Sequence, residues 1–249
     1  MKVLKYKKIK NKYKVYFDND SSLDLYEDTI LKFNLLLKKE IDDNTLNSMI
    51  IFNNKEDIYF NALKYINIKI RSKDEIYKYL SKKNYDKDDI NEIINRLEKE
   101  NIINDEVYIR SYIHDRFNLS SEGPMKIKYS LSNMDTKLVN KYIEEINEED
   151  ILNKLDKLVD KKIKSIKNYS GNVLKMKILN YFSNLGYSRE DIEKVLSNKS
   201  IKNDNGIKEY TKLYNKYSKK YEGYELEKVI ANKLYSKGYD INEIKKDII

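Results

Sequence analysis

The seven residues GYSREDI, from Gly186 to Ile192, occur in four versions along the chain. The other versions are NYDKDDI at 84–90, GYDINEI at 238–244 and a degenerate NMDTKLV at 133–139. A leading glycine or asparagine can take the left-handed conformation that ends a helix. The serine or aspartate at the third position suits the cap of a following helix, and three versions carry an acidic residue three positions later. We therefore predict a tight turn between two helices at each version.

The flanks of these turns repeat as well. Apolar side chains recur at the spacing of a helix face, nine and five residues before the second position of the turn and nine residues after it. Those residues are Ile76, Met125, Ile178 and Ile230; Leu80, Tyr129, Phe182 and Leu234; and Ile94, Ile143, Leu196 and Ile248. A helix-start signal also stands ahead of each turn, where the helix that leads into the turn is expected to begin. These signals are Ser72 with Glu75, Gly123-Pro124, Gly171 and Gly223. Proline fits the first turn of a helix, and Ser-x-x-Glu is a capping-box spacing.

A further helical stretch lies ahead of each copy, at about 57–70, 106–118, 150–168 and 208–221. Each unit is therefore expected to hold three helices, which are too few to bury an apolar face alone. We predict a mainly α fold of tandem three-helix repeats that form an elongated, curved array, with a small N-terminal β-containing extension. The expected domains are 1–55 for the extension and 56–104, 105–147, 148–202 and 203–249 for the four repeats.

The first 55 residues differ in pattern from the rest. Short runs rich in Tyr, Val and Ile at 3–10, 12–17 and 21–25 predict an antiparallel meander. Two short helices are expected at 27–36 and 44–52. Three strands with one apolar face need a partner to be stable, so we expect this piece to pack on the first repeat.

Composition excludes several classes of chemistry. The chain of 249 residues has no cysteine and one histidine, which excludes disulfides and thiolate ligands and leaves few metal sites. No glycine-rich phosphate loop is present, and we expect no cofactor. No apolar run is long enough to span a membrane, and no apolar segment of a signal peptide follows the basic N-terminus, so we expect a cytoplasmic protein. We also expect a monomer. The net charge of +8 permits a polyanionic partner, and residues 1–14 carry seven lysines and no acid.

The stretch NIINDEVYIRSYIHDRFN, at 101–118, gathers Asp, His and Arg in a short window. The repeat places it at the junction of the first two repeats, where Asp105 is expected to cap a helix that starts at Glu106. His114 and Asp115 then point away from the apolar stripe of that helix and are expected to be solvated. Arg116 lies on the stripe. We interpret this window as a junction between helices and not as a catalytic site.

The residues of 62–124 resemble the core of the RecX family, the regulators of the RecA recombinase. The resemblance rests on order and spacing, and its residues are Ala62-Leu63, Arg71-Ser72, Glu75-Ile76, Tyr79-Leu80, 102–105, Tyr108, Arg116 and Gly123-Pro124. The N-terminal residues 14–18, 27–28 and 31–33 are similar to the strand-containing extension of longer members. The turn at 131–134 departs from the family, because it is shorter and lacks its glycine.

The resemblance implies a protein that is not an enzyme. Members of this family bind the RecA–single-stranded DNA filament along its helical groove, block ATP hydrolysis and strand exchange, and so regulate DNA repair and recombination. The implied partner is the RecA filament, with single- or double-stranded DNA as a further partner. Two alternatives stay open, namely a helical-repeat protein that binds nucleic acid directly and an enzyme acting on nucleic acid with a divalent metal.

Arginine is scarce in this chain, and four of the five arginines lie between 71 and 116. From this cluster and from the lysines beside Gly123-Pro124 we expect six residues to contribute to a partner-facing surface. They are Lys64, Arg71, Arg110, Arg116, Lys126 and Lys128. The structural alternative is that Arg116 only lies along its own helix and that Arg71 pairs with a local acid.

Overall fold

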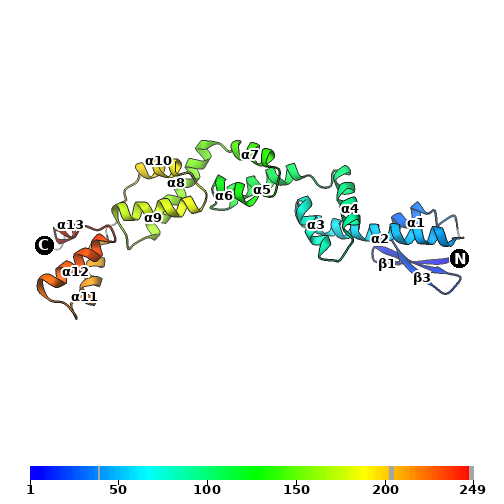
Figure 1. Ribbon diagram of the computed structural model, residues 1–249, viewed down its shortest axis with the longest axis horizontal. Helices are drawn as coiled ribbons and strands as arrows, with labels where there is room; N and C mark the ends of the chain where they lie inside the picture. Colours follow the sequence, from blue (N-terminus) through cyan, green and yellow to red (C-terminus); the bar gives the residue numbers. More distant parts are fainter. Residues whose placement is uncertain (39, 202–204, 247–249) are drawn as a thin grey trace. The chain divides into compact units, whose positions relative to one another are not determined.

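The computed structural model describes residues 1–38, 40–201 and 205–246, which form thirteen helices and three strands. The chain divides into two compact units, Met1–Tyr108 and Ile109–Ile249. Figure 1 labels their helices and strands. No described helix is both long and apolar enough to cross a membrane. The prediction of a mainly α fold with a small N-terminal sheet is confirmed.

The first unit begins with the predicted meander. Strands β1 (Val3–Ile9), β2 (Lys12–Phe17) and β3 (Ser22–Leu25) form an antiparallel sheet in the order β1-β2-β3. Side chains alternate across it, and the face that holds Val15, Phe17 and Leu25 packs into a core with α1 (Glu27–Lys32) and the start of α2. One face of the sheet is thereby covered by helices (Figure 1).

Helix α2 (Asp43–Ile66) is a single helix of 24 residues. The expectation of separate helices at 44–52 and 57–70 was therefore wrong. No glycine or proline interrupts the helix between its two halves, and Asn53 in its middle contacts the N-terminal extension. Its Oδ1 accepts hydrogen bonds from the backbone of Tyr26 and from the hydroxyl of Thr29. The helix thus belongs both to the extension and to the first three-helix group.

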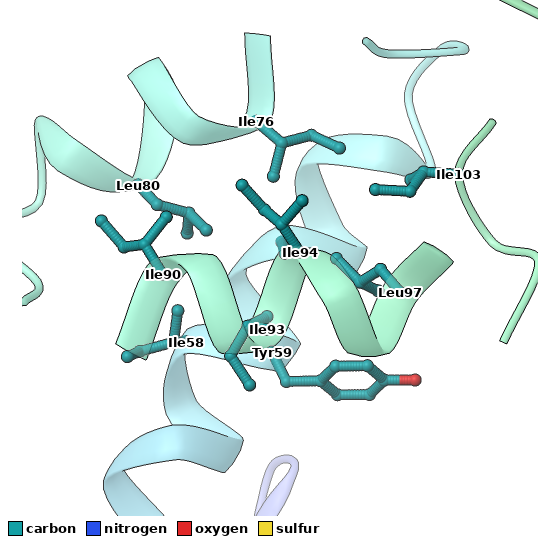
Figure 2. Close-up of a cluster of buried hydrophobic side chains, with 10 residues drawn as sticks. Ile58, Tyr59, Ile76, Leu80, Ile90, Ile93, Ile94, Leu97 and Ile103 are labelled. Atoms are coloured by element: carbon teal, nitrogen blue, oxygen red, sulfur yellow. The ribbon is translucent and has the colours of Figure 1, made fainter. Parts of the chain in front are cut away.

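Helices α3 (Lys73–Ser81) and α4 (Lys87–Lys99) complete that group with the second half of α2. Their apolar faces meet in one cluster of buried side chains (Figure 2). Ile76 and Leu80 of α3 are fully buried there, as the repeat predicts. Ser72 caps α3 in a capping box with Glu75, which confirms the predicted start of this helix.

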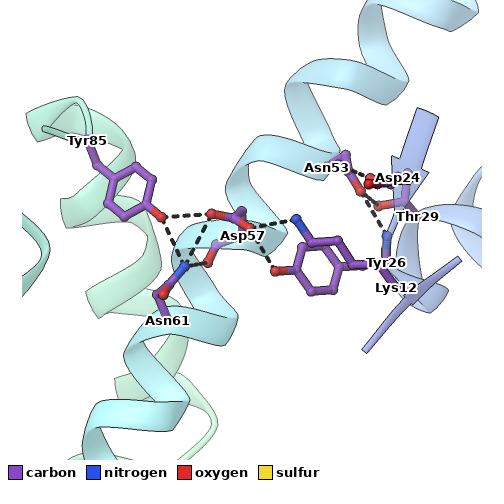
Figure 3. A network of polar contacts seen from close by, with 8 residues as sticks. All are labelled: Lys12, Asp24, Tyr26, Thr29, Asn53, Asp57, Asn61 and Tyr85. Carbon is purple, nitrogen blue, oxygen red and sulfur yellow. Dashed lines mark hydrogen bonds and ion pairs between the residues drawn. The ribbon is translucent and has the colours of Figure 1, made fainter. Parts of the chain in front are cut away.

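A polar cluster ties the N-terminal sheet to the first three-helix group (Figure 3). The Asp57 carboxylate on α2 accepts hydrogen bonds from Lys12 Nζ of β2 at 2.8 Å and from the hydroxyls of Tyr26 and Tyr85 at 2.7 Å each. Tyr85 is the tyrosine of the turn at 84–90, and Asn61 Nδ2 donates to its hydroxyl and to Asp57. The expected packing of the extension on the first repeat is therefore observed.

The second unit contains the greater part of α5 and all of α6 to α13. Their bounds are α5 (Asp105–Leu119), α6 (Pro124–Ser130), α7 (Thr136–Glu144), α8 (Glu148–Ser165), α9 (Gly171–Asn184), α10 (Arg189–Ser197), α11 (Gly206–Tyr217), α12 (Gly223–Tyr235) and α13 (Ile241–Lys246). Helices α8 to α10 share one buried cluster, and α11 to α13 share another. Each cluster is the core of one three-helix group.

Three of the four predicted turns adopt the expected geometry. Asn84, Gly186 and Gly238 all have positive φ, and Asn133 does not. The third position caps the next helix in all four copies, because Asp86, Asp135, Ser188 and Asp240 each accept a hydrogen bond from a backbone N–H two or three residues later. The degenerate copy thus keeps its cap and loses its left-handed residue.

The helix before that degenerate turn is in a different register from the one predicted. Met125 and Tyr129 are 59% and 79% exposed, whereas Ile127 and Leu131 are buried. The expectation that Met125 and Tyr129 face the core was therefore wrong. Helix α6 has seven residues where α9 has fourteen, and its buried side chains lie two positions closer to the turn than the repeat predicts. Ile248, which the same pattern placed in the fourth repeat, lies outside the described residues.

Within the second unit the helix starts dock on the turns of the following group. The Gly123 N–H donates to Leu185 O at 2.7 Å, and the Met125 N–H donates to Gly186 O at 3.0 Å. The backbones touch so closely that a Cβ on Gly186 would lie 2.3 Å from Lys126 N. A second contact of this kind joins Ser170 to the turn at 237–238. Each pairs residues more than sixty positions apart.

The junction at 101–118 is structural. Asn104 Oδ1 accepts hydrogen bonds from the N–H groups of Glu106 and Val107, so Asn104 caps α5 and the prediction of Asp105 as the cap was wrong. The Asp105 carboxylate instead accepts from the N–H of Lys73, the first residue of α3. His114 and Asp115 have side chains 74% and 67% exposed, as predicted.

Candidate partner-binding surface

Two of the six predicted surface residues lie in the first unit. Lys64 is exposed in the last turn of α2, where a cation also stabilises the helix end. Arg71 is different, because its side chain is only 12% exposed. Its guanidinium lies 3.9 Å from the ring of Tyr65 and 3.5 Å from Glu75. Arg71 therefore pairs with a local acid, which is the alternative that the sequence analysis left open. We assign this side chain to holding α2 against α3.

Arg110 is exposed on α5 in the second unit. It lines a cavity of about 360 Å³ together with His114, Phe117, Tyr142 and Asp150. Among the described residues, no carboxylate forms an ion pair with its guanidinium. The same cavity is also lined by the carboxylates of Glu145 and Asp150. An exposed arginine without an ion-pair partner can bind a carboxylate or phosphate of a partner in bidentate fashion.

Arg116 and Lys126 are brought together by a residue that the sequence analysis missed. The two oxygens of Glu122 lie 3.6 Å from Arg116 Nε and 3.7 Å from Lys126 Nζ, and the Glu122 side chain is 16% exposed. Arg116 also donates to the hydroxyl of Tyr112 at 3.3 Å, and this hydrogen bond raises the pKa of Arg116 above its ordinary value. The result is a pair of half-exposed cations at the corner where α5 ends and α6 begins.

Lys154 of α8 also contacts the corner between α5 and α6. The sequence analysis did not identify this residue. Its ammonium donates to the carbonyl oxygens of Phe117 and Glu122 and lies 4.3 Å from the Phe117 ring. Burial lowers the pKa of Lys154, and the charge of Glu122 opposes this effect. Nothing in the local sequence marks Lys154. Glu122 could have been suspected, because it directly precedes Gly123-Pro124.

Lys128 lies two residues after Lys126 on α6. It borders an apolar cavity of about 340 Å³, whose other walls include Met125, Tyr129 and Val139. The exposed Met125 and Tyr129 are therefore neighbours of a cation and not members of the core. Four of the predicted residues thus lie on α5 and α6 of the second unit. In the first unit, Lys64 lies at the end of α2 and Arg71 lies directly before the start of α3.

The described residues of this arrangement are mainly cations that can bind an anionic partner. The described residues contain no group of three His, Cys, Asp or Glu side chains that could hold a metal ion. The cations lie on helix faces, and Glu122 holds Arg116 and Lys126 close together. Such a surface suits contacts with carboxylates or phosphates of a macromolecule.

The chain matches known proteins over nearly its whole length. Residues 59–97 match the family model of the RecX first three-helix domain. The regulatory protein RecX of Streptococcus agalactiae serotype Ia is 32% identical over 98% of this chain and 97% of its own length. The regulatory protein RecX of Streptococcus uberis is 33% identical with the same two coverages.

Solved structures agree with the sequence comparison. A crystal structure of a regulatory protein RecX covers 79% of this chain and 98% of its own, with a TM-score of 0.68 and 20% identity, which shows the shared fold. The crystal structure of RecX from Lactobacillus salivarius is 26% identical and covers 57% of this chain and 94% of its own, with a TM-score of 0.54. The chain belongs to the RecX family of regulatory proteins.

Proposed function

We propose that this protein binds RecA–single-stranded DNA filaments and inhibits ATP hydrolysis and strand exchange by RecA. The observation that carries the proposal is the identity of 32% to 33% with regulatory proteins RecX over 98% of the chain. We further propose that it acts without catalysing a reaction, as a cytoplasmic monomer that requires no cofactor.

The structure supports this proposal through its repeated construction. We propose the repeats 56–104, 105–147, 148–202 and 203–249 after an extension of residues 1–55. Each repeat offers its own exposed helix faces, so contacts to successive subunits of a filament can each be weak. Weak contacts that are linked in one chain add through effective concentration, and the whole can bind tightly without one strong site.

The partner surface is proposed to use five exposed or half-exposed cations. Arg71 is not one of them, and its proposed role is to hold α2 against α3. The variant to test replaces all five with Gln, namely Lys64, Arg110, Arg116, Lys126 and Lys128. A matched control removes the same charge at exposed lysines of the third and fourth repeats, namely Lys161, Lys164, Lys208, Lys212 and Lys219. We expect at least tenfold weaker inhibition of RecA ATP hydrolysis from the first variant only. Equal inhibition by both variants would reject this surface.

The second candidate function is direct binding of nucleic acid without a recombinase partner. The net charge of +8 and the unneutralised Arg110 favour it. It predicts tight binding to bare DNA with an affinity that falls steeply as salt rises. ATP hydrolysis by RecA would then fall only when the protein is abundant enough to cover the DNA.

A further inference from the structure

The N-terminal sheet has a second face that the helices do not cover. Strand register places Lys5, Lys7, Lys14 and Tyr16 on the side opposite Val15 and Phe17. Lys5 and Lys7 are exposed, and Lys14 and Tyr16 are half-buried. The fold needs only the other face, which packs on α1 and α2. The residue types on this outer face therefore call for their own explanation.

Two lysines face each other at the centre of this outer face. Lys7 of β1 lies directly opposite Lys14 of β2. Like charges in directly opposed positions of an antiparallel pair are destabilising. In the described part of the chain, Lys5, Lys7 and Lys14 form no ion pair, and the one acid opposite them in register is Asp24, across from Lys14 on β3. Three cations against one carboxylate leave the face positive, and an anion from outside would relieve the repulsion.

An aromatic ring lies among these charges. Tyr16 is paired with Lys5 across the strands, and the Lys5 ammonium lies 4.6 Å from the centre of the Tyr16 ring. Lys5 and Lys7 are two residues apart on one strand, which spaces them by about 7 Å along the sheet. A row of cations beside an aromatic ring on an open sheet is the arrangement that binds single strands, where phosphates follow the charges and unstacked bases stack on the ring.

We propose that the outer face of the sheet, formed by Lys5, Lys7, Lys14 and Tyr16, binds single-stranded nucleic acid through its phosphates and one stacked base. Duplex DNA fits less well, because its bases are already stacked and cannot reach the ring. The site extends the proposed function by assigning the nucleic-acid contact to the N-terminal extension. It is tested with DNA alone, so its failure and the failure of the proposed function are distinguishable.

The test is fluorescence anisotropy with a labelled oligothymidylate of about 30 nucleotides at several salt concentrations. The variant Lys5→Gln/Lys7→Gln/Lys14→Gln is expected to bind at least tenfold more weakly at low salt. Its slope of log affinity against log salt should be shallower by about 2, because each contact to a single strand contributes about 0.7. The control Lys208→Gln/Lys212→Gln/Lys219→Gln changes the net charge equally and should lose less than twofold. Equal losses in both variants, or no loss in either, would overturn the proposal.

The base contact is tested separately by Tyr16→Leu, which keeps an apolar side chain and all the lysines. Loss of one stacked base should weaken binding by about fivefold to a hundredfold with an unchanged salt slope. Polyglutamate serves as a competitor without bases and is expected to displace the DNA only at far higher concentration. Unchanged affinity of Tyr16→Leu together with effective competition by polyglutamate would show a general polyanion site and would overturn the assignment to nucleic acid.

A parallel ATP hydrolysis assay separates this site from the proposed function. If the natural sequence inhibits RecA and the triple lysine variant binds DNA normally, the site is wrong and the function stands. If the triple variant loses DNA binding and the natural sequence leaves RecA unaffected, the site stands and the function is wrong. Circular dichroism of both triple variants confirms that the sheet and helices are intact.

Discussion

Removing the charge of Asp57 should loosen the N-terminal sheet from the first three-helix group. Asp57 accepts hydrogen bonds from Lys12, Tyr26 and Tyr85, and these three lie on separate elements. Burial raises the pKa of Asp57, but the hydrogen bonds and the charge of Lys12 outweigh it and lower the pKa to about 2. The variant Asp57→Asn keeps the shape of the side chain and removes its charge.

The size of the effect follows from linkage between protonation and folding. The ordinary pKa of 3.8 and the folded value of about 2 correspond to at most about 2.4 kcal/mol, at about 1.36 kcal/mol for each factor of ten. The Asp57 side chain is 32% exposed, so screening by water reduces the expected loss to about 1–2 kcal/mol. Because the folded pKa is the lower one, this stabilisation is complete above about pH 5 and about half of it is gone at pH 3.

Hydrogen exchange measured by mass spectrometry reports this loss locally. Peptides from β2 and from the turn at 84–90 should exchange about 5–30-fold faster in Asp57→Asn at pH 7. The difference from the natural sequence should shrink at pH 3, after correction for intrinsic exchange rates. The control Asp20→Asn makes the same chemical change at an exposed turn residue and should leave both peptides unchanged. A difference that is the same at pH 3 and pH 7, or equal in the control, would refute the reasoning.

Two further predictions concern the packing of the repeats. Gly186→Ala places a Cβ 2.3 Å from Lys126 N at a residue with φ +87, so peptides of α6 should lose at least about 3 kcal/mol of protection from hydrogen exchange. The control Gly223→Ala has φ +51 and no atom within 4 Å of the new Cβ, so it should cost only about 1 kcal/mol. Equal costs for the two variants would disprove the docking of α6 on the turn at Gly186. Arg96→Met leaves the 1% exposed Glu56 without its partner at 2.6 Å and should cost about 3 kcal/mol in urea unfolding, and adding Glu56→Met should restore most of it. No recovery in the double variant would show that packing and not the buried charge sets the cost.

The elements that could be predicted from sequence are those fixed by local chemistry. The turns at 84–90, 186–192 and 238–244 combine a left-handed residue with a helix cap, and both act within a few positions along the chain. The capping box of Ser72 and the meander of the first 25 residues are local in the same sense. Such signals predict an element without any knowledge of its neighbours.

The errors arose where a distant contact decided the outcome. Separate helices were expected at 44–52 and 57–70, yet α2 runs through the interval, and Asn53 there accepts a hydrogen bond from the distant Tyr26 N–H. Asp105 and Asn104 are equally suitable caps, and Lys73 of another helix determines which is used for α5. The contact of Gly123 with the turn at Gly186 spans sixty-three residues and has no local signature.

The predicted surface shows the same limit. The clustering of scarce arginines in 71–116 predicted a partner-facing surface there. The sequence alone does not distinguish the half-exposed Arg116 from Arg71, whose guanidinium lies over the ring of Tyr65. Both are single cations near helix ends, and their difference lies in which aromatic ring happens to be within reach. The pairing of Arg116 with Lys126 through Glu122 required the structure of the α5–α6 corner.

The measurement that bears most directly on the proposed function is ATP hydrolysis by RecA on single-stranded DNA, with this protein added well below the RecA concentration. Binding to the same DNA without RecA is measured in parallel. Our account predicts strong inhibition at a small fraction of the RecA concentration, together with far weaker binding to bare DNA. Inhibition that appears only when the protein is abundant enough to coat the DNA would contradict it and would favour direct competition for nucleic acid.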